Sequence, residues 1–243
     1  MNLHFNLIDW QASAPGLSEP ADWQHWAQHE AMIDAALPLA KCRHLPMMTA
    51  RRLSGGSRLA VDCGLALLRR QQVDAIVFTS RHGELERNLR ILTALAEQQS
   101  VSPTDFAMSV HNAAVGSLTI AASAPIVATS LAAGVDSFQQ GMVEVAALHG
   151  AGYQQVLLVD FDGRVPDRYL PWLAADTPRW PYAVALLLAS GEQLSCTSEI
   201  SQQPASSGWP QSLQFLYARL AAHRQFSIGG AQLNWCWECH HAI

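Results

Sequence analysis

The stretch Ala124–Val145 restricts the possible folds more than any other part of the sequence. It starts with a short apolar segment, Pro125–Thr129, that is typical of a buried strand, and it continues into a turn of small residues, Ser130–Ala133. A helix is predicted from Gly134 onward, because apolar residues recur there at helical spacing, namely Val135, Phe138, Met142 and Val145. Many enzymes place a nucleophile at such a turn, since the free N–H groups of the first helical turn acidify a thiol and stabilise an oxyanion.

Composition and charge narrow the class of partner. The chain has 243 residues, 49% of them hydrophobic and 14% charged, which is enough for a sizeable core. A net charge of -5 gives no electrostatic reason to expect nucleic acid or an anionic membrane as a partner. The longest apolar run, Ala183–Ala189, is far shorter than the roughly 20 residues of a membrane span, and Met1–Trp10 does not resemble a secretory signal. We therefore expect a cytoplasmic protein that has no membrane span and that binds a protein or a small molecule.

The cysteine pattern does not indicate a disulfide framework or a metal site. Five cysteines are irregularly spaced, so reduced thiols are expected. The segment Cys236–His241 spells C-x-x-C-H-H, a pattern shared with haem attachment and with half of a zinc site. We interpret it as coincidence, because haem attachment needs an exported chain and structural zinc needs four fixed ligands. No cofactor and no metal are expected, and adventitious metal binding by this tail stays open.

Strand and helix patterns alternate from residue 50 onward, which predicts a layered α/β fold with a mainly parallel sheet. Besides the segment before Ser130, the predicted strands are Phe5–Trp10, Asp74–Ser80, Gln155–Phe161, Tyr182–Ala189 and one closing strand near Phe226–Trp237. The predicted helices include one through Leu59, Cys63, Leu67 and Leu68, one through Leu89, Leu92 and Leu95, and one over Ser212–His223. Between them, His82 and Glu86 suggest a metal or acid–base pair, but we interpret the charged residues here as helix caps.

Two motifs carry a resemblance to a known family. The run Ala128–Val135 resembles the active-site phrase A-T-A-C-T-S-G-V of β-ketoacyl synthases in the thiolase superfamily, and Asn112–Ile120 resembles the helix that precedes it, N-x-x-x-G-x-L-T-I. Phe226–Leu233 is more weakly similar to the glycine-rich closing turn of the same enzymes. The resemblance implies a thiolase-like fold in one truncated domain, residues 1–243. Residues 1–190 would retain the first half, and residues 191–243 would be a strongly shortened second half.

The same resemblance implies that the chain has lost the ketosynthase chemistry. Leu131 stands where the family has its acyl-accepting cysteine, and a leucine cannot accept an acyl group. The family's two catalytic histidines come from the second half, and no H-G-T-x-T-like run occurs here. Ser130 is a candidate substitute nucleophile, but neither motif nor spacing nominates a base for it.

Two further runs, Arg81–Arg87 and Ser109–Ala114, resemble the chain-length-factor-like component of bacterial aryl polyene biosynthesis. Such a subunit is non-catalytic, forms a heterodimer with a full-length ketosynthase, and shapes the acyl tunnel of polyketide or fatty-acid-type synthesis. The resemblance implies a set of residues at the partner interface or on the tunnel wall: His111, Asn112, Val115, Leu131, Asp136 and Phe138.

Three arginines before and within the first long helix suggest a second, transient partner. Arg51, Arg52 and Arg58 are candidates for docking the acidic surface of an acyl carrier protein, and the alternative is a solvated helix start. Two other functions stay open at this point. One is a stand-alone acyl-thioester hydrolase or acyltransferase that uses Ser130, and the other is a homodimeric acyl-binding scaffold.

Overall fold

The computed structural model describes residues 1–29, 32–174, 177–201 and 208–240. Seven strands form one sheet: β1 (Asn2–Ser13), β2 (Ala75–Thr79), β3 (Val127–Leu131), β4 (Gln155–Asp162), β5 (Tyr182–Ile200), β6 (Gln225–Gly229) and β7 (Leu233–Cys239). Their order is β3-β2-β4-β5-β7-β6, and β1 pairs with β5 over both the part that pairs with β4 and the part that pairs with β7. The boundary at residue 190 that the sequence suggested lies inside β5.

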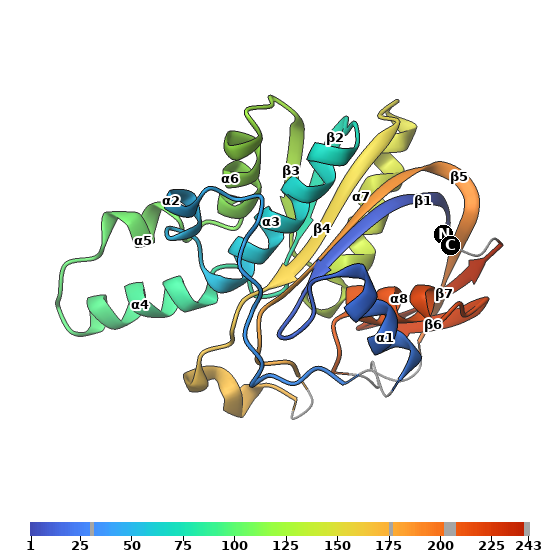
Figure 1. Cartoon of the computed structure of the whole chain (residues 1–243). Helices are drawn as coiled ribbons and strands as arrows, with labels where there is room; N and C mark the ends of the chain where they lie inside the picture. Colours follow the sequence, from blue (N-terminus) through green and yellow to red (C-terminus); the bar gives the residue numbers. More distant parts are fainter. Residues whose placement is uncertain (30–31, 175–176, 202–207, 241–243) are drawn as a thin grey trace.

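Helices cover both faces of this sheet. They are α1 (Pro20–Gln28), α2 (Met47–Ala50), α3 (Gly55–Arg70), α4 (Leu85–Ala96), α5 (Pro103–Ala107), α6 (Ala113–Ala122), α7 (Ser137–Gly150) and α8 (Gln211–Leu220), with 3-10 turns at Gly134–Asp136 and Asp167–Trp172. Side chains of α3 and α6 pack on one face, and those of α7, α8 and α1 pack on the other (Figure 1). This layered α/β arrangement confirms the predicted thiolase-like fold class.

The prediction of a mainly parallel sheet is wrong. Only β2 runs parallel to its neighbours β3 and β4, whereas β5 runs antiparallel to β4, β1 and β7. The reason lies in the connections: helices link β2 to β3 and β3 to β4, but the described residues between β4 and β5 form no α-helix. The single closing strand expected near Phe226–Trp237 is also wrong, because two glycines, Gly229 and Gly230, lie where the chain folds back to form the β6–β7 hairpin.

The central strand–helix unit forms as predicted, with a shifted strand. β3 begins at Val127 and continues through Ser130 and Leu131, because its pairing with β2 extends to the pair Thr79 and Leu131. Ser130 and Leu131 are therefore strand residues and do not belong to the turn. After Gly134, which has a φ of +61° that favours glycine, the chain enters α7. The predicted apolar face is confirmed for three residues, since Phe138, Met142 and Val145 are buried.

One pair of helices leaves the body of the molecule. α4 and α5 extend away from the sheet in Figure 1. The predicted helix through Leu89, Leu92 and Leu95 is confirmed, but Leu92 and Leu95 are 56% and 58% exposed. We call residues 85–107, which comprise α4, α5 and their connection, the arm.

Several expected absences concern only the part of the chain that the structure describes. No helix there combines the length and apolar character that a bilayer crossing requires. The five cysteines are free thiols, and no cluster of three metal-ligating side chains occurs among these residues. Cys236 and Cys239 lie in β7, and His241 lies outside the described residues.

Candidate functional site

Ser130 and Leu131 point to opposite faces of the sheet at the end of β3. Leu131 packs against the core cluster that contains Phe138 and Met142 of α7. Its aliphatic side chain therefore occupies the face on which α7 begins. A leucine there has no lone pair to offer a carbonyl carbon, so this face of β3 has no nucleophile at the position that the family motif predicts.

The Ser130 hydroxyl contacts an imidazole that no pattern in the sequence links to it. His111 Nδ1 lies 2.7 Å from Ser130 Oγ, and His111 Nε2 lies 3.2 Å from the Ser80 carbonyl oxygen. When Nε2 carries the proton and donates to Ser80, Nδ1 is free to accept from the serine hydroxyl. Ser130 Oγ also lies 3.1 Å from the His111 carbonyl oxygen. The residues are 19 positions apart with no shared motif, so only tertiary structure reveals the pair.

This serine–histidine pair lacks two parts of a hydrolytic site. The first turn of α7 lies on the Leu131 side of the sheet, so its N–H groups are on the wrong face to stabilise an oxyanion formed at Ser130. A carbonyl oxygen of Ser80 orients the imidazole in place of the carboxylate of a triad. The contacts instead join the end of β3 to β2 and to the segment between α5 and α6.

Two buried carboxylates lie where β4 ends. Asp160 accepts hydrogen bonds from Thr79 Oγ1 at 2.6 Å, Ser212 Oγ at 2.5 Å and Tyr182 Oη at 3.2 Å. Asp162 accepts from Ser80 Oγ at 2.6 Å and from the His82 backbone N–H at 2.8 Å. Burial raises the pKa of each carboxyl group to about 6. The signal in the sequence was the alternation of aspartates with apolar residues in β4, a pattern that by itself predicts only a strand.

A cavity of about 270 Å³ adjoins these carboxylates at the carboxyl end of β2 and β4. Ligands of open α/β sheets commonly bind at this end. Its lining includes Arg81, His82, Phe138, Asp162, Trp180 and Trp209. Burial, followed by the charge of Arg81, lowers the pKa of His82 to about 4, so this imidazole is neutral near pH 7. Gly56 brings the start of α3 close to β4, because a Cβ there would lie 2.5 Å from the Asp162 carbonyl oxygen.

The predicted interface residues occupy different environments. Asn112 is exposed just before α6, and His111 and Leu131 are half-buried. Val115 and Phe138 are 5% and 2% exposed and belong to the core. These two side chains offer no surface to a partner in the single chain, so for them only the tunnel-wall role stays a prediction.

Asp136, the sixth predicted interface residue, makes contacts within the chain. Its carboxylate accepts from Gln211 Nε2 at 3.1 Å, from the Ala231 backbone N–H at 3.0 Å and from Trp235 Nε1 at 3.4 Å. These bonds join the turn before α7 to the start of α8 and to the β6–β7 hairpin. A role for Asp136 at a subunit interface or on a tunnel wall stays a prediction.

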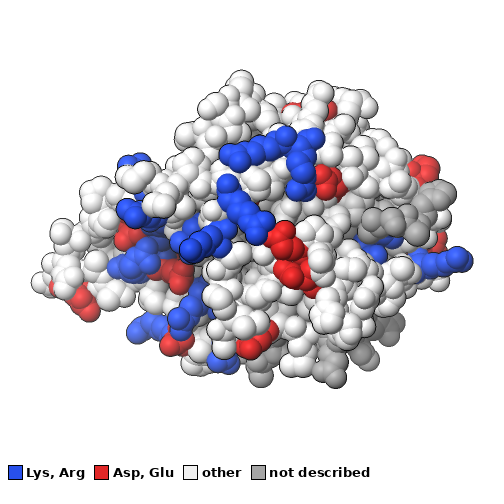
Figure 2. Space-filling model, viewed as in Figure 1, with Lys and Arg blue, Asp and Glu red and all other residues white. Residues whose placement is uncertain are grey.

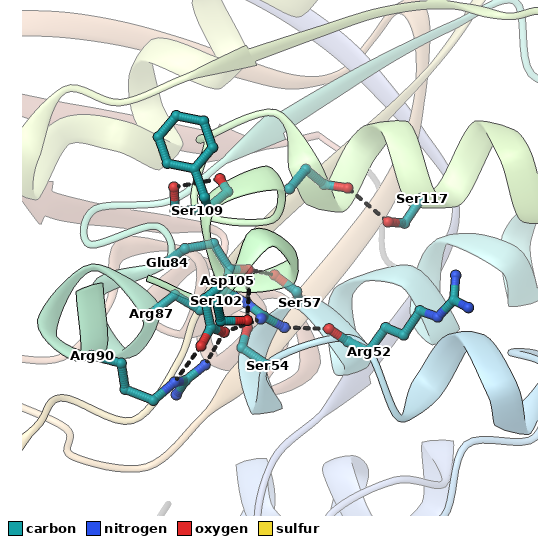
Figure 3. Close-up of polar contacts among 12 residues, drawn as sticks. Arg52, Ser54, Ser57, Glu84, Arg87, Arg90, Ser102, Asp105, Ser109 and Ser117 are labelled. Atoms are coloured by element: carbon teal, nitrogen blue, oxygen red, sulfur yellow. Dashed lines mark hydrogen bonds and ion pairs between the residues drawn. The ribbon is translucent and has the colours of Figure 1, made fainter. Parts of the chain in front are cut away.

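The charged residues near the start of α4 form an internal network. Figure 3 shows Glu84 beside Ser57 and Arg87, and Asp105 beside Arg87 and Arg90. Glu84 accepts from Ser54 Oγ at 3.0 Å, from Ser57 Oγ, and from Arg87 Nε at 3.0 Å. Glu84 occupies the N-cap position of α4 and Glu86 lies in the first turn, as the interpretation of these charged residues as helix caps expects, but the Glu84 carboxylate makes no capping hydrogen bond and bonds instead to hydroxyls at the start of α3. In the described part of the chain, no hydrogen bond or ion pair joins His82 to Glu86.

The three arginines considered for carrier-protein docking lie near the start of α3. Arg51 and Arg52 are exposed, Arg58 is half-buried, and none forms an ion pair with another described residue. In Figure 2, Lys and Arg side chains gather mainly on the left and centre of the face shown, with acidic side chains among them. Docking at these three positions stays a prediction.

Comparison with known proteins places this geometry in a family. No curated protein matches the sequence. Among solved structures, the ishigamide ketosynthase/chain length factor is 15% identical with a TM-score of 0.67, covering 82% of this chain and 68% of that chain. A β-ketoacyl synthase from Burkholderia phymatum STM815 is 12% identical with a TM-score of 0.59, covering 91% of this chain and 71% of that chain. These two likenesses support the fold alone.

A third structure is much closer in sequence. It is the ketosynthase ApeO in complex with its chain length factor ApeC from Xenorhabdus doucetiae, with 56% identity, a TM-score of 0.93, and coverage of 97% of this chain and 99% of that chain. The family model of the β-ketoacyl synthase N-terminal domain matches residues 23–238. This chain, which resembles a chain-length-factor-like subunit, therefore belongs to the β-ketoacyl synthase N-terminal domain family.

Proposed function

We propose that this chain is a non-catalytic, chain-length-factor-like subunit. It forms a heterodimer with a full-length β-ketoacyl-[acyl carrier protein] synthase and shapes the acyl tunnel in polyene, polyketide or fatty-acid-type biosynthesis. The observation that carries the proposal is Leu131, which replaces the nucleophile on a strand whose outer edge pairs with no other described strand. The match over almost the full length of a chain in a ketosynthase–chain length factor complex supports the same role.

The free edge of β3 supports the heterodimer. β3 has β2 on one side and no further strand on the other among the described residues. Val127 on this strand is 51% exposed, and Ile120 on the neighbouring helix α6 is 79% exposed. An unpaired edge flanked by apolar side chains is a surface that proteins normally cover, and a strand of a second subunit can add to it through main-chain hydrogen bonds.

The distribution of exposed apolar side chains points to the same side of the molecule. More than half of the large apolar residues that are exposed in the described part of the chain come from α2, the arm, α6, the segment between the arm and α6, and β3, which lie together in Figure 1. They are Met47, Met48, Leu92, Leu95, Phe106, Val110, Ile120 and Val127. An apolar surface of this kind is typical of obligate subunit contacts.

A second candidate function rests on the contact between His111 and Ser130. An imidazole 2.7 Å from a serine hydroxyl is the first requirement of a serine hydrolase or acyltransferase. We rank it below the subunit role, because the described residues place no oxyanion site and no orienting carboxylate around this serine. The hydrolase or acyltransferase function predicts that the isolated chain turns over acyl thioesters and that Ser130→Ala abolishes this turnover.

An acyl carrier protein would be a transient third partner in the proposed complex. Arg51, Arg52 and Arg58 have no acidic partner among the described residues, so their charge is available to an acidic surface. The homodimeric scaffold, in contrast, predicts that the chain associates with itself and ignores a ketosynthase.

Co-expression with a ketosynthase encoded beside this chain tests the proposal. Size-exclusion chromatography with mass detection should give a one-to-one complex, and condensation activity should require both chains. A chain that elutes alone, or a ketosynthase that is equally active and equally selective for product length without it, would contradict the proposed function. Val127→Asp should disrupt the complex, whereas Ile200→Asp is a matched control at an exposed position on β5.

A further inference from the structure

The arm presents an apolar stripe whose outer half is left uncovered by its own fold. Leu85, Leu89, Leu92 and Leu95 follow one another at intervals of four, three and three residues, which places them along one side of α4. Leu92 and Leu95 are exposed, as is Phe106 at 69% on α5. α4 packs chiefly against α5 and not against the sheet. A soluble helix with such a stripe normally buries it.

The base of the arm is held by buried charges. Arg87 Nη1 lies 2.8 Å from Asp105 Oδ1, and Arg87 Nε lies 3.0 Å from Glu84 Oε2. The Arg87 and Glu84 side chains are only 6% and 3% exposed. Arg90 Nη2 adds a second contact to Asp105 at 2.7 Å (Figure 3). These bonds link α4 to α5, to the start of α3 and to the Arg52 carbonyl oxygen, so the apolar stripe is held in a fixed position before any partner binds.

The composition of residues 91–104, which we call the outer arm, favours a protein as the partner of the arm. Glu97 is the only charged residue in positions 91–104. Nucleic acid would need a basic surface, and an amphipathic helix that lies on an anionic membrane carries Lys and Arg on its polar face. The outer arm has neither, and it fits the apolar surface of another protein.

The small size of the β3 edge, and the exposed apolar residues between it and the arm, favour the ketosynthase as the protein that covers the arm. β3 has five residues, an edge of about 17 Å, whereas a stable interface buries about 800 Å² on each partner. The edge strand alone is too small for that. Val110 lies between the arm and α6 in the chain and is 51% exposed, so exposed apolar side chains follow one another along the chain from Phe106 on the arm through Val110 to Ile120 on α6 and Val127 on β3.

We infer that the arm is a second contact surface for the same ketosynthase that pairs with β3. The ketosynthase contacts the free edge of β3 with one part of its surface and the Leu92–Leu95 stripe with another. The charged cluster at the base of the arm sets the distance between the two contacts. This inference rests on the proposed heterodimer and names the surface that adds affinity to it.

Binding of purified chain to purified ketosynthase, measured by surface plasmon resonance, tests the inference. The double variant Leu92→Lys with Leu95→Lys should bind about 100-fold more weakly, because two central apolar contacts become buried charges. Ile200→Lys, a control at another exposed apolar position, should bind like the unmodified chain. Circular dichroism and urea unfolding of the double variant should stay unchanged, because both leucines are already exposed in the free chain.

The possible outcomes separate the arm from the heterodimer itself. If the unmodified chain binds the ketosynthase and the double variant binds equally well, the arm inference is overturned and the proposed function stands. If the unmodified chain does not bind, the proposed function fails. If the double variant changes only the self-association of the chain, measured by sedimentation, the occupant is a second copy and the inference is overturned. Slower amide hydrogen exchange in α4 within the complex would support it, and unchanged exchange there would count against it.

Discussion

Helices α3 and α4 have equally regular apolar spacing, but only α3 buries its apolar side chains. Leu59, Cys63 and Leu67 on α3 are at most 3% exposed and pack against the sheet and α6. Leu92 and Leu95 on α4 are more than half exposed, because the arm leaves the body of the molecule. The same pattern thus stabilises the core in one helix and leaves an exposed apolar surface in the other, which we propose a partner covers. Periodicity predicts a helix but does not say which molecule covers it.

The largest effect should come from breaking the charged cluster that joins the two regions. Arg87→Ala would leave the Glu84 carboxylate buried without its cation, and removing one partner of a buried ion pair costs about 3–5 kcal/mol. Arg90→Ala removes the exposed cation next to the same Asp105 and should cost less than about 1 kcal/mol. Urea unfolding measures both values. Equal losses for the two variants would mean that burial does not distinguish the arginines.

A pair of leucine truncations tests the comparison between the helices directly. Leu67→Ala leaves a cavity under α3 and should lower the free energy of unfolding by about 2–5 kcal/mol. Leu92→Ala removes the same atoms from an exposed position and should change it by less than about 0.5 kcal/mol in the isolated chain. Thermal and urea unfolding of the two variants give the values. A large loss for Leu92→Ala would show that the stripe is covered within the free chain.

The carboxyl groups at the end of β4 have raised pKa values, whereas the pKa of Asp105 at the base of the arm is lowered. Hydrogen bonds from Arg90, followed by the charges of Arg90 and Arg87, lower the pKa of Asp105, whereas burial raises the pKa of Asp160 and Asp162 to about 6. Between pH 4 and pH 6 these two groups bind protons in the folded chain and not in the unfolded one. His82 has the opposite effect: because its pKa is lowered to about 4, it binds a proton in the unfolded chain and not in the folded one over the same range.

The net difference in that range is one proton, so the free energy of unfolding should fall by about 1.4 kcal/mol per pH unit, or about 3 kcal/mol in total, as the pH rises from 4 to 6. Glu86, with a raised pKa, and His149, with a lowered pKa, have opposite effects on the pH dependence of the free energy of unfolding over this range. His82→Asn removes the opposing group and keeps the backbone N–H that Asp162 accepts, so it should roughly double the slope. Urea unfolding at a series of pH values measures both slopes. A stability that rises with pH over this range would contradict the assignment.

The sequence predicts those parts of the fold in which local pattern and final environment agree. β2, β4, α3 and α7 each have an apolar pattern that matches the face they bury, so their existence and positions were predictable. The direction of β5 was not, because parallel and antiparallel strands that are buried on both faces look alike in sequence. Leu131 was found through the family motif, since a missing cysteine is visible in a linear alignment.

Other parts of the site depend on residues that only the folded chain brings together. The hydroxyls of Thr79 and Ser212 come from β2 and α8, and both bond to Asp160 on β4. No spacing rule connects such positions, because the sheet order and the packing of α8 set their distance. The exposure of the arm could not be predicted either, because the apolar pattern of α4 is the same as that of a helix that buries one face.

The smallest expected effect concerns Ser130, which connects β3 to the segment that follows the arm. Ser130→Ala removes its hydrogen bond to His111 and should lower the free energy of unfolding by about 1 kcal/mol, because water can replace the hydroxyl at the half-buried imidazole. Ketosynthase binding and condensation by the complex should persist, since the serine serves as a link within the chain. Acyl-thioester hydrolysis by the isolated chain, measured with a thiol-reactive dye, should stay at background before and after the change. Turnover by the unmodified chain that disappears in Ser130→Ala and in His111→Gln would instead make Ser130 a nucleophile, and β3 would then carry chemistry as well as an interface.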